Sequence, residues 1–374
     1  MQALSEAWGK FRALHAAFLP RRQRMVGNSA RANSVRTAGV RPSSQGRLQV
    51  SASRSMITMP LAATRRNLAL PKAASSMRSL SITKPRADHL DLTAGENREQ
   101  CLAWATITEI LQLTPTAKKM VLRVDGTGQA GDGWSFKAGQ WVDFHIPSVD
   151  TVGGYSIASI PRELPYMDLV VKASKHPPAA WVCEQALVGD QVQMRVGGEF
   201  VAKTVEPRNG SGPRLLFIAG GVGINPLYSI LRDTLAAAED ADSTGEGLQK
   251  APRVALIFSA ISAEELVFLP ELSALAASQP QRLRLFLTCT GQSAESTATQ
   301  VETHAVSSGR VDSSMIGEAV EWLGGAEPAH DANDNCGGVD AVYVCGPPGM
   351  AQGMVEECGV KGIPPSQVHF ESWW

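Results

Sequence analysis

The sequence predicts two folded domains in one chain, a small antiparallel β-barrel followed by a doubly wound parallel α/β domain. Residues 99–205 read as short strands punctuated by Gly and Pro, a pattern typical of small barrels. From residue 215 onwards, continuous apolar runs alternate with helical stretches, as a parallel sheet covered on both faces requires. A glycine-rich turn follows the first of these runs, where a domain of this kind binds ligands.

A basic N-terminal segment precedes the two domains. Residues 1–86 contain thirteen Arg and three Lys but a single acid, Glu6. Large apolar side chains recur there at helical spacing: Trp8, Phe11, Leu14 and Phe18. This composition is typical of an organelle transit peptide, removed up to about residue 78 on import into the mitochondrion or, alternatively, a plastid. A disordered basic tail that touches nucleic acid is the other interpretation.

The composition of the remaining residues argues against several classes of function. They contain 35 acids against 19 bases, so nucleic acid is not an expected partner. No run approaches the roughly 18 apolar residues of a membrane span. The cysteines form no C-x-x-C pair, which argues against structural zinc, a dithiol centre or a common iron–sulfur cluster. They are Cys101, Cys183, Cys289, Cys336, Cys345 and Cys358.

The barrel is predicted over residues 87–206. Its clearest strand patterns lie at 120–124, 140–146, 168–172 and 191–196, with Gly and Pro between them. One helix is expected at about 178–186.

The α/β domain is predicted over residues 207–374 and begins with a Gly- and Pro-rich linker at 207–213. The apolar runs expected to form parallel strands are 215–219, 254–259, 283–288 and 341–344. Helices are expected at 226–238, 264–277, 313–323 and 348–358. Polar stretches expected to form surface loops are 239–251, 291–309 and 324–339.

The most informative motif is LLFIAGGVGINP at 215–226. Gly220, Gly221 and Gly223 permit a sharp turn and close approach to a ligand, and Pro226 suits a first helical position. A strand that reaches a helix N-terminus through glycines is an anion site, usually for a pyrophosphate. The candidate dinucleotide-binding residues are therefore Gly220, Gly221, Gly223, Ile224, Asn225 and Pro226. The third glycine of the dinucleotide fingerprint is absent, and a plain strand-to-helix turn is the alternative.

Three further motifs follow in the chain. GYSIAS at 154–159 places a Tyr and two hydroxyls where they could stack on a flat ring and hydrogen-bond its edge; an ordinary half-exposed strand is the alternative. VCGPPGM at 344–350 puts Cys345 at the carboxyl end of a parallel strand, where open α/β sheets bind ligands; an inert buried thiol is the alternative. FESWW at 370–374 ends in two Trp that either pack on the domain or cover a cofactor ring.

Together and in this order, these motifs resemble the ferredoxin–NADP reductase-like superfamily, which pairs a flavin-binding barrel with a nicotinamide-binding α/β domain. Within it, residues from about 87 to 374 are similar to the oxidoreductase NAD-binding domain-containing protein 1 family. Besides the glycine loop, the similarity is carried by RADHL at 86–90, FKAGQWVDF at 136–144, VGGYS at 152–156, KHPPAAWV at 175–182, RVGGEF at 195–200 and CGPP at 345–348.

The resemblance implies roles for individual residues of the barrel. Three residues match the superfamily's flavin motif Arg-x-Tyr-Ser-x-x-Ser, and would hold FAD: Tyr155, Ser156 and Ser159. Gly153 stands where the superfamily has the Arg that pairs with the flavin phosphates. The cations that could replace that charge are Lys172, Lys175 and His176.

In the α/β domain, Cys345, Gly346 and Pro347 match the segment that borders the nicotinamide in the superfamily. Glu371 and Trp374 fall where the superfamily places a C-terminal carboxylate and a ring-covering aromatic side chain. The catalytic candidates are Cys345, Ser156 and Glu371.

The resemblance implies an oxidoreductase that passes hydride from NAD(P)H to FAD and electrons on to a separate acceptor, a small molecule or a redox protein. No second redox motif occurs in the chain, and the acceptor is not identified by the sequence. A catalytically degenerate NAD(H)-binding sensor or interaction protein is the second hypothesis, which Gly153 keeps open.

NADH is expected to bind more tightly than NADPH. A 2′-phosphate needs a cation, normally Arg, beyond the second strand of the dinucleotide domain. No Arg or Lys lies between Arg253 and Arg282. Glu264 would accept a hydrogen bond from a free ribose hydroxyl and repel a phosphate, or it merely begins a helix, where acids are favoured. Arg310 is the cation that could fold back towards this site.

Overall fold

A computed structural model describes residues 88–127, 133–203, 212–243, 251–291, 299–301, 304–324 and 338–372. All of them belong to one compact unit, Ser81–Trp374. The predicted transit peptide, the predicted boundaries near 86 and 206, and Trp374 lie outside the described residues.

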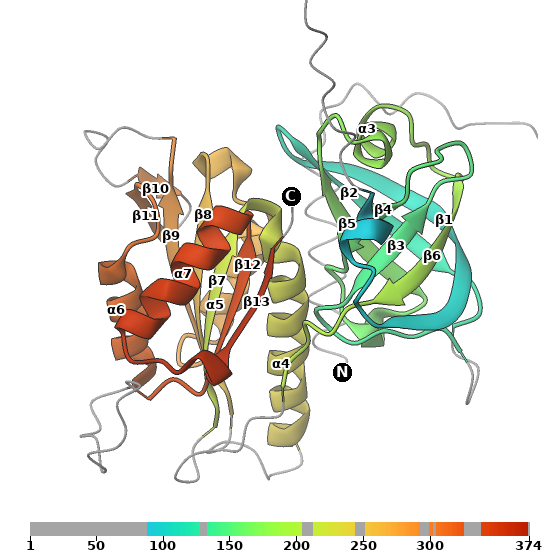
Figure 1. Ribbon diagram of the computed structural model, residues 1–374. Helices are drawn as coiled ribbons and strands as arrows, with labels where there is room; N and C mark the ends of the chain where they lie inside the picture. The colour runs from blue at the N-terminus through green and yellow to red at the C-terminus, as the bar shows by residue number, and fades with distance from the viewer. Residues whose placement is uncertain are drawn as a thin grey trace, which may run out of the picture. The chain divides into compact units, whose positions relative to one another are not determined.

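Six antiparallel strands form the first domain (Figure 1). They are β1 Arg98–Thr114, β2 Ala117–Val124, β3 Trp141–His145, β4 Gly153–Ser156, β5 Tyr166–Lys172 and β6 Gln191–Gly197. Their order is β4-β3-β6-β1-β2-β5, and an antiparallel bridge between Ile157 and Leu169 joins the two end strands into a nearly closed barrel. The predicted barrel is confirmed.

The barrel core follows from alternation along the strands, since successive side chains point to opposite faces. In β2, Met120, Leu122 and Val124 point inward and are almost completely buried. The sequence does not predict the 17-residue strand β1. Its inward positions begin with two alanines, and a register shift follows Ile107, so large apolar residues do not alternate regularly along it. Two short helices belong to this domain, α2 His89–Leu92 and α3 Pro177–Glu184.

The second domain is the predicted doubly wound parallel sheet. Its parallel strands are β7 Arg214–Gly220, β8 Arg253–Ala260, β9 Leu283–Cys289, β11 His304–Ser308, β12 Ala341–Gly346 and β13 Val368–Ser372. The sheet order is β10-β11-β9-β8-β7-β12-β13, with the short edge strand β10 Thr299–Val301 antiparallel to β11.

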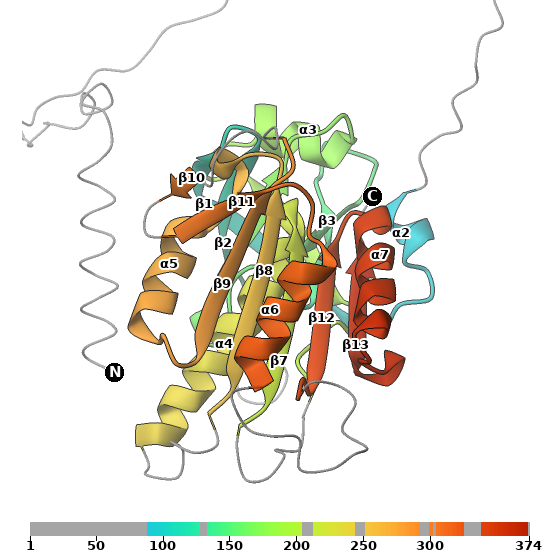
Figure 2. The same cartoon turned by 90° about the vertical axis from the view of Figure 1, so that its left-hand side faces the viewer.

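Helices cover both faces of this sheet. One apolar cluster packs against α4 Ile224–Ser243 and α5 Leu269–Ser278, and a second packs against α6 Ser313–Gly324 and α7 Pro348–Val360. Figure 2 shows α6 and α7 together on one face. The first cluster also contains barrel residues such as Val170 and Phe200, so the two domains share a core. Among the described residues, no helix has the length and hydropathy needed to cross a membrane.

Several element boundaries differ from the predictions. The stretch 291–309, predicted as loop, contains β10 and β11. Among the described side chains of β11 only Val306 is buried, so no apolar run marks this strand in the sequence. The helix predicted at 264–277 begins only at Leu269, because Phe268 adopts a left-handed conformation (φ 62°) that interrupts it. β13 was not predicted, since its polar, half-buried sequence lacks an apolar run.

Candidate functional site

The strand order of the parallel sheet reverses between β7 and β12, which is where open α/β sheets bind ligands. β7 ends at Gly220, the Gly221–Gly223 turn follows, and α4 begins at Ile224. Gly221 has φ +55°, a conformation that glycine adopts without strain. Pro226 is the third residue of α4 rather than the first as predicted; a first-turn position still needs no N–H donor.

The segments after β7 and β12 are packed directly on each other. A Cβ at Gly223 would overlap the carbonyl oxygen of Cys345 and approach the Gly346 nitrogen to 2.8 Å. A Cβ at Gly220 would overlap the Met350 sulfur and lie 3.0 Å from Pro347 Cδ. The structure therefore brings together the predicted glycines and the predicted Cys345–Pro347 segment. Gly220 and Gly223 are therefore required for the close packing of these two segments.

A cavity of about 410 Å³ joins the barrel to the start of α4. Residues of the flavin motif line it, together with the end of β5 and the beginning of α3. The lining residues are His89, Gly154, Tyr155, Ser156, Val170, Val171, Lys172, Ala173, Ser174, His176, Ala179, Val222 and Asn225. Predicted flavin and dinucleotide residues thus meet in one cavity, although they lie some 70 positions apart in the chain.

Two polar groups at this cavity are buried without a hydrogen-bond partner among the described residues. One is the hydroxyl of Tyr155, whose pKa is raised by burial, so that the phenol is neutral near pH 7. Its ring lies edge-on to Phe144, with centroids 5.4 Å apart. The other is Oδ1 of Asn225, whose Nδ2 donates to the Val170 carbonyl at 2.9 Å. Buried polar atoms normally have partners, so these two unsatisfied atoms beside the cavity are candidates for pairing with a polar ligand or a water molecule.

His89, which the motif at 86–90 contained without a predicted role, forms one wall of the cavity. Its ring lies so close to Gly154 that any Cβ there would overlap it. It packs edge-on against Trp141 at 4.8 Å, and its Nε2 lies 3.2 Å from Oδ1 of Asp143. No sequence pattern marks this pairing, because the partners come from a helix and a strand more than 50 residues apart.

Asp143 holds the wall in place. Its carboxylate is fully buried, and Oδ2 accepts hydrogen bonds from Arg98 Nε at 2.9 Å and Arg195 Nη2 at 2.8 Å. Burial alone would raise the pKa of this carboxyl, but hydrogen bonds from His89 and the two arginines outweigh it and lower the pKa far below the ordinary range. The carboxylate is therefore ionised throughout the physiological range.

The remaining predicted site residues have varied positions. The Ser159 hydroxyl accepts the Asp168 backbone N–H at 3.0 Å and does not line the cavity. Ile224 is completely buried in the core shared by the domains, as is Cys345. Glu371 lies on β13 beside Cys345 in the parallel register.

Lys172 is exposed at the end of β5. It points to the same side of the strand as Val170, which packs with the α4 core, whereas Val171 packs inside the barrel. Lys172 therefore faces the dinucleotide loop. Lys175 is exposed and does not line the cavity, and His176 precedes α3.

The residues around this cavity fit the ring of a flavin better than its phosphates. Tyr155, Ser156 and Asn225 offer hydrogen bonds and a flat face to a heterocycle. Gly153, at the predicted Arg position, has no room for any side chain: a Cβ would lie 2.8 Å from the Tyr155 ring and 2.9 Å from Pro178 Cβ. Two prolines at the start of α3 remove N–H donors at the same place.

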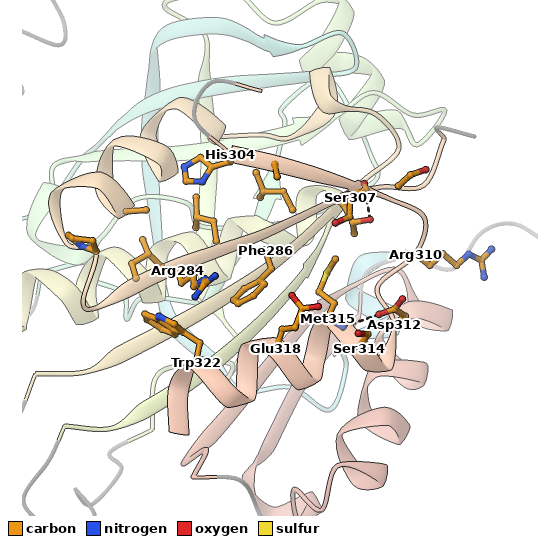
Figure 3. A pocket seen from close by; sticks show the side chains of 18 of the residues that line it. Arg284, Phe286, His304, Ser307, Arg310, Asp312, Ser314, Met315, Glu318 and Trp322 are labelled. Carbon is orange, nitrogen blue, oxygen red and sulfur yellow. Dashed lines mark hydrogen bonds between the residues drawn. The ribbon is translucent and has the colours of Figure 1, made fainter. Parts of the chain in front are cut away.

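A larger cavity, of about 740 Å³, lies between β9, β11 and α6 (Figure 3). None of the predicted site residues lines it. It contains Arg310, the cation predicted as able to approach a 2′-phosphate, together with Arg284, Phe286 and Trp322. Glu264, the predicted ribose-binding residue, is exposed beyond the carboxyl end of β8.

The barrel, the parallel sheet and the cavity beside the glycine loop together form the two-domain ferredoxin–NADP reductase-like fold. The "Oxidoreductase NAD-binding domain" family model matches residues 217–356. Solved structures with this fold include the cytochrome P450 reductase GcoB of Amycolatopsis (TM-score 0.55, 20% identity, 74% of this chain and 71% of that one). Another is a ferredoxin NADP+ reductase from Neisseria gonorrhoeae with bound FAD and NADP (TM-score 0.53, 18% identity, 74% and 100%).

The bovine oxidoreductase NAD-binding domain-containing protein 1 is 34% identical over 300 residues, which cover 79% of this chain and 88% of that protein. The chain belongs to the oxidoreductase NAD-binding domain-containing protein 1 family.

Proposed function

We propose that this protein is a flavin-dependent NADH oxidoreductase that delivers electrons to a separate acceptor. The observation that carries the proposal is the cavity in which Tyr155 and Ser156 of the barrel meet Val222 and Asn225 beside the glycine loop. This arrangement would bring a ring bound to the barrel against the nicotinamide of a dinucleotide bound to the α/β domain.

A bound flavin supplies the redox chemistry, since it accepts hydride and releases electrons singly or in pairs. The protein's residues bind, orient and exclude water. The Gly220–Gly223 segment and the N-terminus of α4 would receive the dinucleotide phosphates, with Lys172 facing them across the cavity. The neutral Tyr155 hydroxyl and the Asn225 amide oxygen would hydrogen-bond a ring.

The three catalytic candidates have different surroundings. Ser156 lines the cavity and is nearly buried, so its hydroxyl is the candidate for hydrogen bonding to the flavin ring edge. Cys345 is completely buried at the end of β12, where it would form the floor beneath the nicotinamide. Glu371 lies on the neighbouring strand, and we assign it a supporting position beside that floor.

The test is anaerobic reduction of the protein reconstituted with flavin. NADH should bleach the flavin absorption band, and an artificial acceptor should then restore it. Saturable NADH binding without bleaching would contradict the proposal and favour the sensor hypothesis instead. The variant Ser156→Ala should slow bleaching, whereas Ser174→Ala, at a lining serine outside the flavin motif, should change it much less.

We also propose import into the mitochondrion, from the basic, acid-poor composition of residues 1–86. The full chain fused to a fluorescent protein should co-localise with a mitochondrial marker. A plastid signal in a plant cell would favour the alternative organelle, and a diffuse cytosolic signal would contradict import.

A further inference from the structure

We propose that this protein holds a flavin through its ring and that its described residues give the adenylate half of FAD no site, so that FMN and FAD bind with similar affinity. The inference rests on the proposed function and concerns which part of the flavin the cavity binds. It follows from four features of the residues around the cavity.

The first feature is the supply of backbone N–H donors at α3. A diphosphate is usually received by several N–H groups at a helix N-terminus. Here Pro177 and Pro178 are the first two residues of the helix and have no N–H. The N–H of His176 donates to the Ser174 hydroxyl at 3.3 Å, which leaves Ala179 as the first residue of the helix with an N–H. The start of this helix can therefore donate backbone hydrogen bonds to one phosphate group at most.

The second feature is the absence of a side chain, and of space for one, at Gly153. A Cβ there would lie 2.9 Å from Pro178 Cβ, which is closer than real Cβ contacts. The helix that has lost its donors therefore also occupies the volume from which a guanidinium would reach a phosphate. The missing Arg side chain and the missing N–H donors are linked by packing, because Gly153 in β4 lies directly against Pro178 in α3.

The third feature is the engagement of the neighbouring cations. Arg98 and Arg195 both hydrogen-bond Asp143, and Arg98 also donates to the Thr93 carbonyl at 2.6 Å. Moving either of them to a phosphate would leave the fully buried carboxylate of Asp143 with less compensation. That carboxylate lies directly behind His89 and is compensated by the two arginines, which are therefore held in place by it.

The fourth feature is the wall that His89 forms. Its ring contacts the backbone at Gly154 and is held from behind by Asp143 and Trp141. Lys172, the lysine that lines the cavity, is the exposed last residue of β5, on the side of that strand from which Val170 packs with the α4 core. The cavity thus accepts a ring and its nearest substituents; its lining offers a phosphate the side chains of Lys172, Ser174 and His176, but no guanidinium and no row of backbone N–H groups for a second phosphate.

The experiment is a titration of the purified, flavin-free full chain with riboflavin, FMN and FAD, followed by quenching of flavin fluorescence. We expect the dissociation constants of FMN and FAD to agree within tenfold. FAD binding tenfold or more tightly than FMN would overturn the inference and leave the proposed function intact. Absence of binding by all three flavins would contradict both.

Two variants locate the binding in this cavity. Tyr155→Ala should weaken riboflavin, FMN and FAD by a common factor of at least about tenfold, because it removes a ring contact shared by all three. Tyr155→Phe, which keeps the packing against Phe144, should weaken all three by a smaller common factor and guards against misfolding of the alanine variant. Tyr166→Ala, at an exposed tyrosine of β5, is the matched control and should change nothing. Unchanged flavin binding in both Tyr155 variants would overturn the inference.

Discussion

At the scale of single residues, the buried carboxylate of Asp143 supports the His89 wall of the cavity although Asp143 does not line the cavity itself. Its three partners come from α2, β1 and β6, and all of them meet one carboxylate. Removing one member of a buried ionic group is costly because the remaining charges stay buried without compensation.

Asp143→Asn should therefore lower the free energy of unfolding by about 3–5 kcal/mol. Urea denaturation at pH 7 measures this difference. The control is Asp125→Asn, which removes an exposed pair with Arg123 (3.4 Å) and should change the stability by less than about 1 kcal/mol. Equal effects of the two substitutions would contradict the role assigned to Asp143.

The same carboxylate predicts a pH dependence. Its pKa in the folded protein lies below the value of about 3.9 expected in the unfolded chain. The stabilisation is thus fully present above about pH 4 and is lost as the pH falls through the folded-state pKa. Wild-type protein should lose stability in this acid range, and Asp143→Asn should lose less over the same interval. Parallel pH profiles for the two proteins would exclude this linkage.

At the scale of elements, the Gly221–Gly223 turn makes a close packing contact, and we propose that it also receives the dinucleotide phosphates. Gly223→Asp should abolish NADH binding, because the new Cβ would displace the Cys345 carbonyl and the carboxylate would repel a pyrophosphate. Titration of NADH into the variant measures this, with thermal melting as a check on folding.

Two glycine substitutions serve as controls for that variant. Gly223→Ala carries the steric part of the change without the charge, and should weaken NADH binding without abolishing it. Gly349→Asp lies in α7, where a Cβ meets nothing within 4 Å, and should leave NADH binding close to wild type. Full NADH affinity in Gly223→Asp would mean that this segment is only a structural turn.

The end of β8 predicts the choice of dinucleotide. No Arg or Lys follows this strand before Arg282, and Glu264 is exposed there. NADH should bind at least about tenfold more tightly than NADPH, a difference of 1.4 kcal/mol. Dissociation constants measured at equal ionic strength test this, and Arg310→Ala should not change their ratio. Equal constants, or a preference for NADPH, would show that another cation receives the 2′-phosphate.

The elements themselves were predictable where burial leaves a simple pattern. β7, β8, β9 and β12 are continuous apolar runs because parallel strands are buried on both faces. β13 and β11 lie near the sheet edges and are half exposed, so no such run marks them. The meeting of Tyr155 with Asn225 was implied by family resemblance, whereas the pairing of His89 with Asp143 depends on tertiary packing that no local pattern encodes.

At the scale of the whole molecule, hydrogen bonds fasten the barrel to the α/β domain. Glu265, buried after β8, accepts hydrogen bonds from Thr114 at 3.0 Å and Thr116 at 2.7 Å. In α4, Arg232 pairs with Glu163, and Ser229 donates to the Ser159 carbonyl at 2.5 Å. These contacts hold the barrel and the α/β domain in a fixed position on either side of the cavity.

Glu265→Ala should lower the free energy of unfolding by about 1–3 kcal/mol, because two threonine hydroxyls lose their acceptor. The affinity for NADH should change less than about threefold, while flavin reduction by NADH should slow, since the rings would be held less rigidly. Stopped-flow absorbance measures that rate. Glu356→Ala, at an exposed acid of α7, is the control and should match wild type; an equal loss of NADH affinity and rate in Glu265→Ala would contradict a purely positioning role.

The first turn of α4 has a consequence for exchanging parts between reductases. Asn225 follows the glycine turn by two residues and donates to the Val170 carbonyl of the barrel, so the helix turn that we assign to the dinucleotide also contacts the other domain. A chimera cut between residues 203 and 212 would preserve each domain's sequence but would replace the backbone that this amide meets. Transplanting the α/β domain therefore requires a barrel whose β5 places a backbone carbonyl where Val170 has its own, so the geometry of the pair, rather than either sequence alone, is what must be inherited or engineered.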